Sequence, residues 1–116
     1  VLDHVQTIAP YFQEKLQTLR DLPLVGDVRG VGLMACVECV ADRQSNNPLG
    51  LDTEVGRRID AHCQELGLLV RPLIHMCVMS PPLVITESEI DDMVAILREG
   101  ISRTMQDLET EGLWRA

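Results

Sequence analysis

Apolar residues recur every three or four positions along parts of the chain, which is the spacing of amphipathic helices. The first such stretch runs from about Asp3 to Arg20. Pro10 within it predicts a kink or a late start, because proline lacks the backbone N–H that an inner helix position donates. The second stretch lies between Asp52, which can cap a helix start, and Gly67, which suits the position just after a helix end.

A third helix is predicted near the C-terminal end of the chain. Thr86 and Glu89 have the spacing of a capping box and stand directly before a run of apolar residues at helical intervals. This pattern continues to about Glu109, where we expect the helix to end.

Valine-rich, alternating segments between the helices predict strands. The segment from Val25 to Val40 has strand composition and is interrupted by glycines, and two shorter strands are expected at about Leu68 to Pro72 and Met76 to Ser80. Gly30 and Gly32, two positions apart, would share one face of the first strand. They indicate either a bend or close helix contact, or room for the backbone of a partner.

The predicted order is therefore helix, strand, helix, strand, strand, helix. This order predicts an α+β fold, a two-layer sandwich in which helices cover a small, mainly antiparallel sheet. The 116 residues fit a single domain that spans 1–116. Residues 43–50 have loop composition and are expected to be the most mobile internal segment.

Composition narrows the class of protein. A hydrophobic fraction of 46% and a charged fraction of 24% are typical of soluble globular proteins, and a net charge of −8 argues against a nucleic-acid partner. No apolar run reaches the roughly 20 residues of a membrane span, and no signal peptide is visible. The cysteines lie in apolar segments, which favours reduced thiols in a cytoplasmic protein. Because the first residue is Val1 rather than Met, we expect the chain to be part of a longer protein.

Cysteine and histidine residues are the first candidates for a metal site. Cys36 and Cys39 have C-x-x-C spacing, but on a strand they would point to opposite faces and could not bind one metal. His62 and His75 could in principle join Cys77, yet none of these spacings is a known ligand set. We therefore expect no metal site and interpret the cysteines as buried and structural.

Arg71 is the candidate binding residue. It is a permanent cation inside the apolar run from Gly67 to Leu83, and its planar fork of N–H donors suits a carboxylate or a phosphate. The ordinary interpretation of such a residue is structural, through an ion pair within the fold. The residues around it favour a functional role.

Three ordered motifs surround this arginine: Leu24–Met34 (LVGDVRGVGLM), Gly67–Pro72 (GLLVRP) and Ser80–Glu87 (SPPLVITE). Together they resemble the C-terminal, smaller domain of class III aminotransferases, which are fold-type I enzymes dependent on pyridoxal 5′-phosphate. The resemblance implies amino transfer between an amino donor and a keto acid, usually in a homodimer. It also implies that the Schiff-base lysine and the phosphate-binding loop belong to an N-terminal large domain missing here. We therefore expect no cofactor on this fragment and no activity from it alone.

The resemblance also implies a role for Arg71. It matches a position where many ω-amino-acid and amine:pyruvate transaminases carry a mobile arginine that binds the substrate carboxylate. Relatives of the ornithine and 4-aminobutyrate type tend to carry an arginine at the position of Val78 instead, so this chain is more similar to the first group. Those relatives usually have glycine at the position of Ile74, followed here by His75, and a bulkier turn is expected.

Two other interpretations stay open at this point. The order of elements loosely permits a free-standing, ferredoxin-like module that binds a ligand or regulates a partner. A relative that epimerises its substrate, or moves an amino group within it, is also possible.

Overall fold

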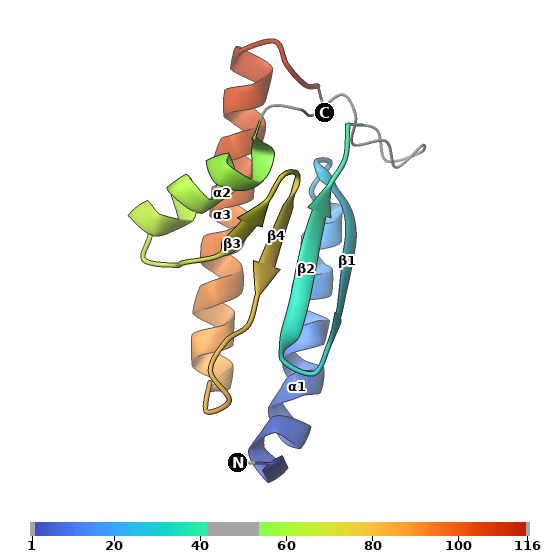
Figure 1. The fold of residues 1–116 in the computed structure, drawn as a ribbon, viewed down its shortest axis with the longest axis vertical. Helices are drawn as coiled ribbons and strands as arrows, with labels where there is room; N and C mark the ends of the chain where they lie inside the picture. Colours follow the sequence, from blue (N-terminus) through green and yellow to red (C-terminus); the bar gives the residue numbers. More distant parts are fainter. Residues whose placement is uncertain (1, 42–53, 116) are drawn as a thin grey trace.

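A computed structural model describes residues 2–41 and 54–115 of the chain (Figure 1). The bounds of the elements are: α1, Leu2–Gln17; the 3-10 helix η1, Thr18–Asp21; β1, Val25–Val31; β2, Met34–Cys39; α2, Val55–Glu65; β3, Arg71–Leu73; β4, Met76–Met79; and α3, Glu87–Thr110. The four strands form one antiparallel sheet in the order β1-β2-β4-β3. The predicted two-layer α+β fold is confirmed.

The helices cover one face of the sheet and leave the other open. In Figure 1 the sheet lies in front of α1 and α3, while α2 lies beside β3 and packs against α3. One cross-strand row, Val28, Val37 and Cys77, is buried beneath the helices. The neighbouring row points the other way because side chains alternate along each strand. We call that side the open face.

The three helices form as their apolar periodicity predicts, with differences at the ends. α1 begins at Leu2 and continues through Pro10, so the late start was wrong, and its last turn tightens into η1. The capping box of α3 is confirmed, because Thr86 Oγ1 accepts from the Glu89 N–H at 3.2 Å. Gly67 follows α2 in the left-handed conformation at φ 95°, as expected for a residue after a helix end.

The N-terminus of α2 differs from the prediction. Asp52, the predicted cap, and the predicted loop 43–50 lie outside the described residues. The residue before the helix is Glu54, whose side chain makes no cap bond. The Gly56 N–H instead donates to the Ile74 carbonyl oxygen at 2.8 Å. A carbonyl from the β3–β4 turn therefore satisfies a helix N–H that would otherwise lack an intrahelical partner.

The single strand predicted from Val25 to Val40 is a hairpin, which corrects the predicted element order. Gly32 has φ 59° and forms, with Leu33, the turn between β1 and β2. Gly30 remains inside β1, so the two glycines do not share a strand face. The closest groups to Gly30 are Met34 and Ala35 of the paired strand and Gln13 of α1, which supports a close helix contact rather than room for another backbone.

Two further features bear on function. The connectivity β1-β2-α2-β3-β4 is not the β-α-β-β-α-β order of a ferredoxin-like fold, so that alternative loses its structural basis. None of the helices within residues 2–41 and 54–115 is both long and apolar enough to cross a lipid bilayer.

Candidate functional site

A groove of about 700 Å³ lies between the β3–β4 hairpin and α3. Its walls come from the extended segment before β3, the segment that follows β4 and the outer side of the first turns of α3. The lining is mainly apolar, through residues such as Leu68, Val78 and Pro82, and includes the charged side chains of Arg71, Glu89 and Asp92. A mainly apolar groove with few charged groups is typical of a small-molecule site.

Arg71 lies on the rim of this groove as the first residue of β3. The strand predicted from Leu68 therefore starts three residues later than expected. Its side chain is exposed. Within residues 2–41 and 54–115 its guanidinium makes no hydrogen bond or ion pair. The fork of donors is therefore available to a group that enters the groove.

The position opposite Arg71 is apolar. Arg71 and Val78 are direct partners in the β3–β4 register, and their row continues across the open face through Cys36 to Arg29. Directly paired side chains on one face lie about 5 Å apart at their Cβ atoms. A ligand held by Arg71 would thus contact an aliphatic surface at Val78 rather than a second cation.

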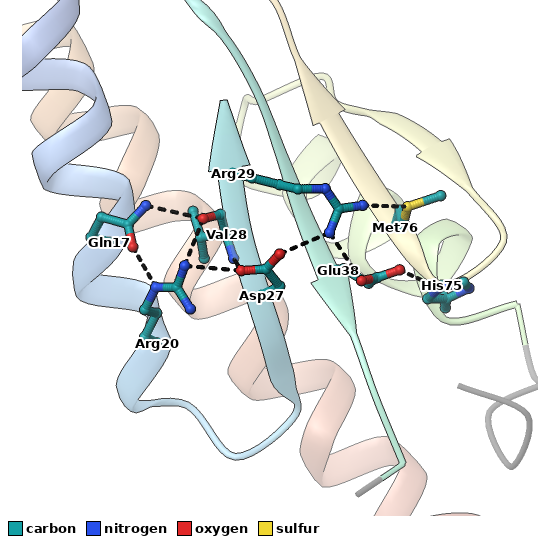
Figure 2. Close-up of polar contacts among 8 residues, drawn as sticks. All are labelled: Gln17, Arg20, Asp27, Val28, Arg29, Glu38, His75 and Met76. Carbon is teal, nitrogen blue, oxygen red and sulfur yellow. Dashed lines mark hydrogen bonds and ion pairs between the residues drawn. The ribbon is translucent and has the colours of Figure 1, made fainter. Parts of the chain in front are cut away.

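Arg29, at the other end of that row, is held in a polar network (Figure 2). Its Nη1 lies 2.9 Å from Asp27 Oδ2 and 3.1 Å from Glu38 Oε1. Arg20 reaches Asp27 at 2.9 Å, and His75 Nε2 lies 3.0 Å from Glu38 Oε2. Basic and acidic side chains thus alternate from η1 across β1 and β2 to the β3–β4 turn. We call these five residues the charged network.

The network shifts the titration of its acids. Hydrogen bonds from His75 and Arg29 lower the pKa of Glu38 below its ordinary value of 4.5. The bond from Arg29 likewise lowers the pKa of Asp27. Both acids are therefore fully ionised at neutral pH, which rules them out as proton donors there.

The first prediction concerns the acid stability of this network. Because the folded state lowers the pKa of Glu38, its ionised carboxylate stabilises the fold above pH 4.5, and this contribution is lost as the pH falls further. Glu38→Gln should therefore reduce the free energy of unfolding by about 1 kcal/mol at pH 7 and by much less at pH 3. Urea denaturation at both pH values measures this. Glu65→Gln is the control, and it should change the stability little, since that carboxylate lies 3.9 Å from Arg103 and is 70% exposed. A loss of stability in Glu38→Gln that is equal at both pH values would contradict the prediction.

The β3–β4 turn has an unusual backbone. Ile74 adopts φ 56° although its side chain is β-branched. That side chain is 72% exposed. This left-handed region disfavours L-residues with a Cβ atom and suits glycine. The bulkier turn expected from the sequence is therefore present, with its strain concentrated at Ile74.

We predict that Ile74→Gly stabilises the protein. Relief of the left-handed strain returns about 1–2 kcal/mol, and the greater freedom of glycine in the unfolded chain removes up to about 1 kcal/mol of this. The exposed side chain contributes little burial, so the net gain should be about 1 kcal/mol in the free energy of unfolding. Ile74→Ala is the control, because it keeps the Cβ atom and should recover little. A gain as large for alanine as for glycine would exclude strain as the cause.

The cysteine and histidine residues considered as metal ligands lie in different parts of the fold. Cys36 is half-buried on the open face and Cys39 is buried on the helix-covered face, as the strand alternation predicted, and burial raises the pKa of Cys39 to about 12. His62 pairs with Asp107 at 2.7 Å and lies apart from His75. Within residues 2–41 and 54–115 no three histidine, cysteine or acidic side chains are arranged to hold a metal ion.

Lys15 is the only lysine of the chain. Its ammonium group lies 3.4 Å from Asp91 and 5.9 Å from the centre of the Tyr11 ring, on the surface between α1 and α3. Lys15, Tyr11 and Asp91 are not among the residues that line the groove.

Sequence reasoning found Arg71 but missed the charged network. Asp27 and Arg29 stand at alternate positions of a strand, which is a signal for a common face, yet Glu38 and His75 join them only through the pairing register.

Comparisons of the sequence with known proteins all point to one family. Residues 1–101 match the family model described as Aminotransferase class-III. The gamma-aminobutyrate transaminase 1, mitochondrial, of Oryza sativa subsp. indica is 37% identical over 102 residues, which cover 88% of this chain and 20% of that protein. A putrescine–pyruvate aminotransferase of Pseudomonas aeruginosa is 38% identical over 96 residues, covering 83% of this chain and 21% of that protein.

Solved structures agree with this match. The structure of an omega-transferase from Vibrio fluvialis JS17 is similar with a TM-score of 0.88 and 32% identity, over 93% of this chain and 26% of that one. The chain spans about a fifth of the length of the curated relatives it matches.

Proposed function

Because the chain belongs to the class III aminotransferases, we propose that it is the C-terminal, smaller domain of a pyridoxal-phosphate-dependent enzyme. The reaction would move an amino group between an amine or ω-amino acid and a keto acid such as pyruvate. The names of the similar proteins, a gamma-aminobutyrate transaminase and a putrescine–pyruvate aminotransferase, support this substrate class.

We further propose that the rest of the enzyme supplies the cofactor site. The bound cofactor would provide the electron sink for amino transfer, and its Schiff-base lysine would lie outside this chain, since Lys15 is held by Asp91 on a different surface from the groove. On this view the chain is inactive alone and acts within a homodimer, as the family resemblance implies, and the cysteines in apolar segments favour a cytoplasmic location.

The role proposed for Arg71 is to bind the carboxylate of the substrate. One observation carries it: the guanidinium is exposed on the rim of the groove and has no partner among residues 2–41 and 54–115. A charge-assisted bond from such a fork contributes about 1.5–3 kcal/mol. Val78, opposite, leaves an apolar surface for substrates that lack a carboxylate.

Arg71→Ala in the full-length enzyme tests this role. The variant should raise the KM for β-alanine or pyruvate by about 10- to 100-fold, which corresponds to the loss of one charge-assisted bond. The half-reaction with a plain amine such as 1-phenylethylamine should change less than about twofold, because that amine has no carboxylate to bind. Single-turnover measurement of each half-reaction separates the two substrate classes.

Two further variants sharpen the result. Arg71→Lys keeps the charge but loses the planar fork and should give an intermediate loss for carboxylate substrates. Arg57→Ala is the matched control, since it removes an exposed arginine whose pair with Glu54 is 3.4 Å long and lies outside the groove. Equal loss for both substrate classes in Arg71→Ala would refute the proposed role. Product analysis in the same assay distinguishes amino transfer from epimerisation or internal migration of the amino group.

A further inference from the structure

The strand that carries Arg71 is weakly held by the sheet. β3 contains three residues, Arg71 to Leu73, and forms the edge of the sheet beside β4. Its central residue is Pro72, which has no N–H to donate to the strand ladder. The position of Arg71 therefore depends strongly on the other end of the strand, where the turn to β4 begins.

That turn is anchored by three hydrogen bonds, one to α2 and two to β2. The Ile74 carbonyl oxygen accepts from the Gly56 N–H of α2 at 2.8 Å, and the His75 carbonyl oxygen accepts from the Cys39 N–H of β2 at 2.9 Å. The third bond joins the side chains of His75 and Glu38, at 3.0 Å. It is the one among the three that a side-chain substitution can remove.

The Glu38 end of this third bond is itself fixed. Its other oxygen lies 3.1 Å from Arg29 Nη1, and the same nitrogen lies 2.9 Å from Asp27. Arg20 holds Asp27 and also donates to the Val28 carbonyl oxygen at 2.8 Å. As Figure 2 shows, the turn is thus connected through basic and acidic side chains to η1.

The backbone of the turn is also strained, so the turn should move when an anchor is removed. Ile74 is held at φ 56°, a conformation that costs about 1–2 kcal/mol for a residue with a Cβ atom. Such strain persists only where the surroundings impose it. Removal of one of the three anchors would let the turn relax, and the short strand attached to it would shift with its arginine.

We propose that His75, held by Glu38 and the charged network, is a positioning residue that sets where the Arg71 guanidinium meets the substrate carboxylate. This inference rests on the proposed function of Arg71 as the carboxylate anchor. His75 contacts neither the reacting atoms nor the cofactor in this account. It acts through the turn, so its removal misplaces the arginine and leaves the fold otherwise intact.

The test compares three variants of the full-length, cofactor-loaded enzyme. His75→Ala should raise the KM for β-alanine by about tenfold and change the half-reaction with a plain amine by less than about twofold, since displacement of a binding group by an ångström has effects of this order or more. His75→Gln keeps a side-chain donor for Glu38 and should restore the KM to within about threefold of the parent.

His62→Ala is the matched control. His62 is also a partly buried histidine paired with a carboxylate, Asp107 at 2.7 Å, but the pair joins α2 to α3 away from the turn. A purely structural role for His75 would make both alanine variants act alike on both substrate classes. The proposal requires selectivity from His75→Ala alone.

Hydrogen exchange on the same proteins tests the anchoring step without any substrate. In His75→Ala the amides of Gly56 and Cys39, which donate to the turn, should exchange at least about tenfold faster, while the amide of Leu97 in the middle of α3 is unchanged. Unchanged exchange, or faster exchange without the selective rise in KM, would overturn the proposal. A non-selective Arg71→Ala variant would instead show that the proposed function has failed, and the positioning role would fall with it.

Discussion

Gly56→Ala is expected to destabilise the fold by about 3 kcal/mol, although alanine is the better helix former. A Cβ atom at this position of α2 would lie 2.7 Å from the Met76 carbonyl oxygen and 3.0 Å from that of Ile74. One atom belongs to the first residue of β4 and the other to the β3–β4 turn, and neither can withdraw without breaking backbone hydrogen bonds. The Gly56 N–H donates to the Ile74 oxygen, so any shift that relieves the clash also stretches this bond. Urea denaturation of the 116-residue chain measures the loss.

A reverse substitution on the same helix provides the control. Ala61→Gly, at an exposed position of α2, should cost about 1 kcal/mol through helix propensity alone. If Gly56→Ala stabilised the protein by a similar amount, the close approach of α2 to the turn would be wrong. In the full-length enzyme Gly56→Ala should also weaken carboxylate substrates selectively, because the same turn carries β3 and Arg71.

The helices were predictable because their signals are local. The capping box of Thr86 and Glu89 fixes the start of α3 to the residue, and the apolar period extends to its observed end. Gly67 marks the end of α2 through its positive φ, which only the backbone freedom of glycine makes easy. The start of α2 was not predictable, since its cap comes from the Ile74 carbonyl, eighteen residues further along the chain.

The hairpin of β1 and β2 was missed because its turn has no strong sequence signal. Gly32 and Leu33 lack the Asn-Gly or Asp-Gly pair that identifies such turns, and Val31 and Met34 continue the apolar composition on either side. The alternation of side chains changes phase across the turn, but a glycine-rich strand can produce a similar irregularity. Composition alone therefore favoured one long strand.

The candidate site was predictable in part. Arg71 could be singled out because a permanent charge in an apolar run needs a partner, and its surrounding motifs resemble a family in which that partner is a substrate. The charged network could not be found this way. Its members are ordinary polar side chains on an open strand face, and only the register that pairs Arg29 with Cys36, two positions from the Asp27–Glu38 pair, brings them together.

Gly30→Ala is the second substitution with a large expected effect, again a loss of about 3 kcal/mol in the free energy of unfolding. A Cβ atom here would clash with the Met34 carbonyl oxygen and lie 2.9 Å from the Ala35 Cα atom, both in the paired strand. It would also lie 2.8 Å from the Gln13 side-chain oxygen. That glutamine joins α1 to the hairpin by donating to the Gly32 carbonyl oxygen at 2.8 Å, so the helix and both strands would be displaced together.

Gly32→Ala separates close approach from backbone conformation as the reason for glycine. Gly32 has φ 59° and open space around the position of a Cβ atom, so alanine there should cost only the left-handed strain of about 1–2 kcal/mol. Urea denaturation of both variants compares their free energies of unfolding directly, provided that these depend equally steeply on the urea concentration. An equal loss at the two positions would mean that the strands relax around a Cβ atom at position 30. The contact between α1 and the hairpin would then not depend on a glycine at that position. A larger loss at Gly30 would assign that glycine to the packing of α1 on the sheet.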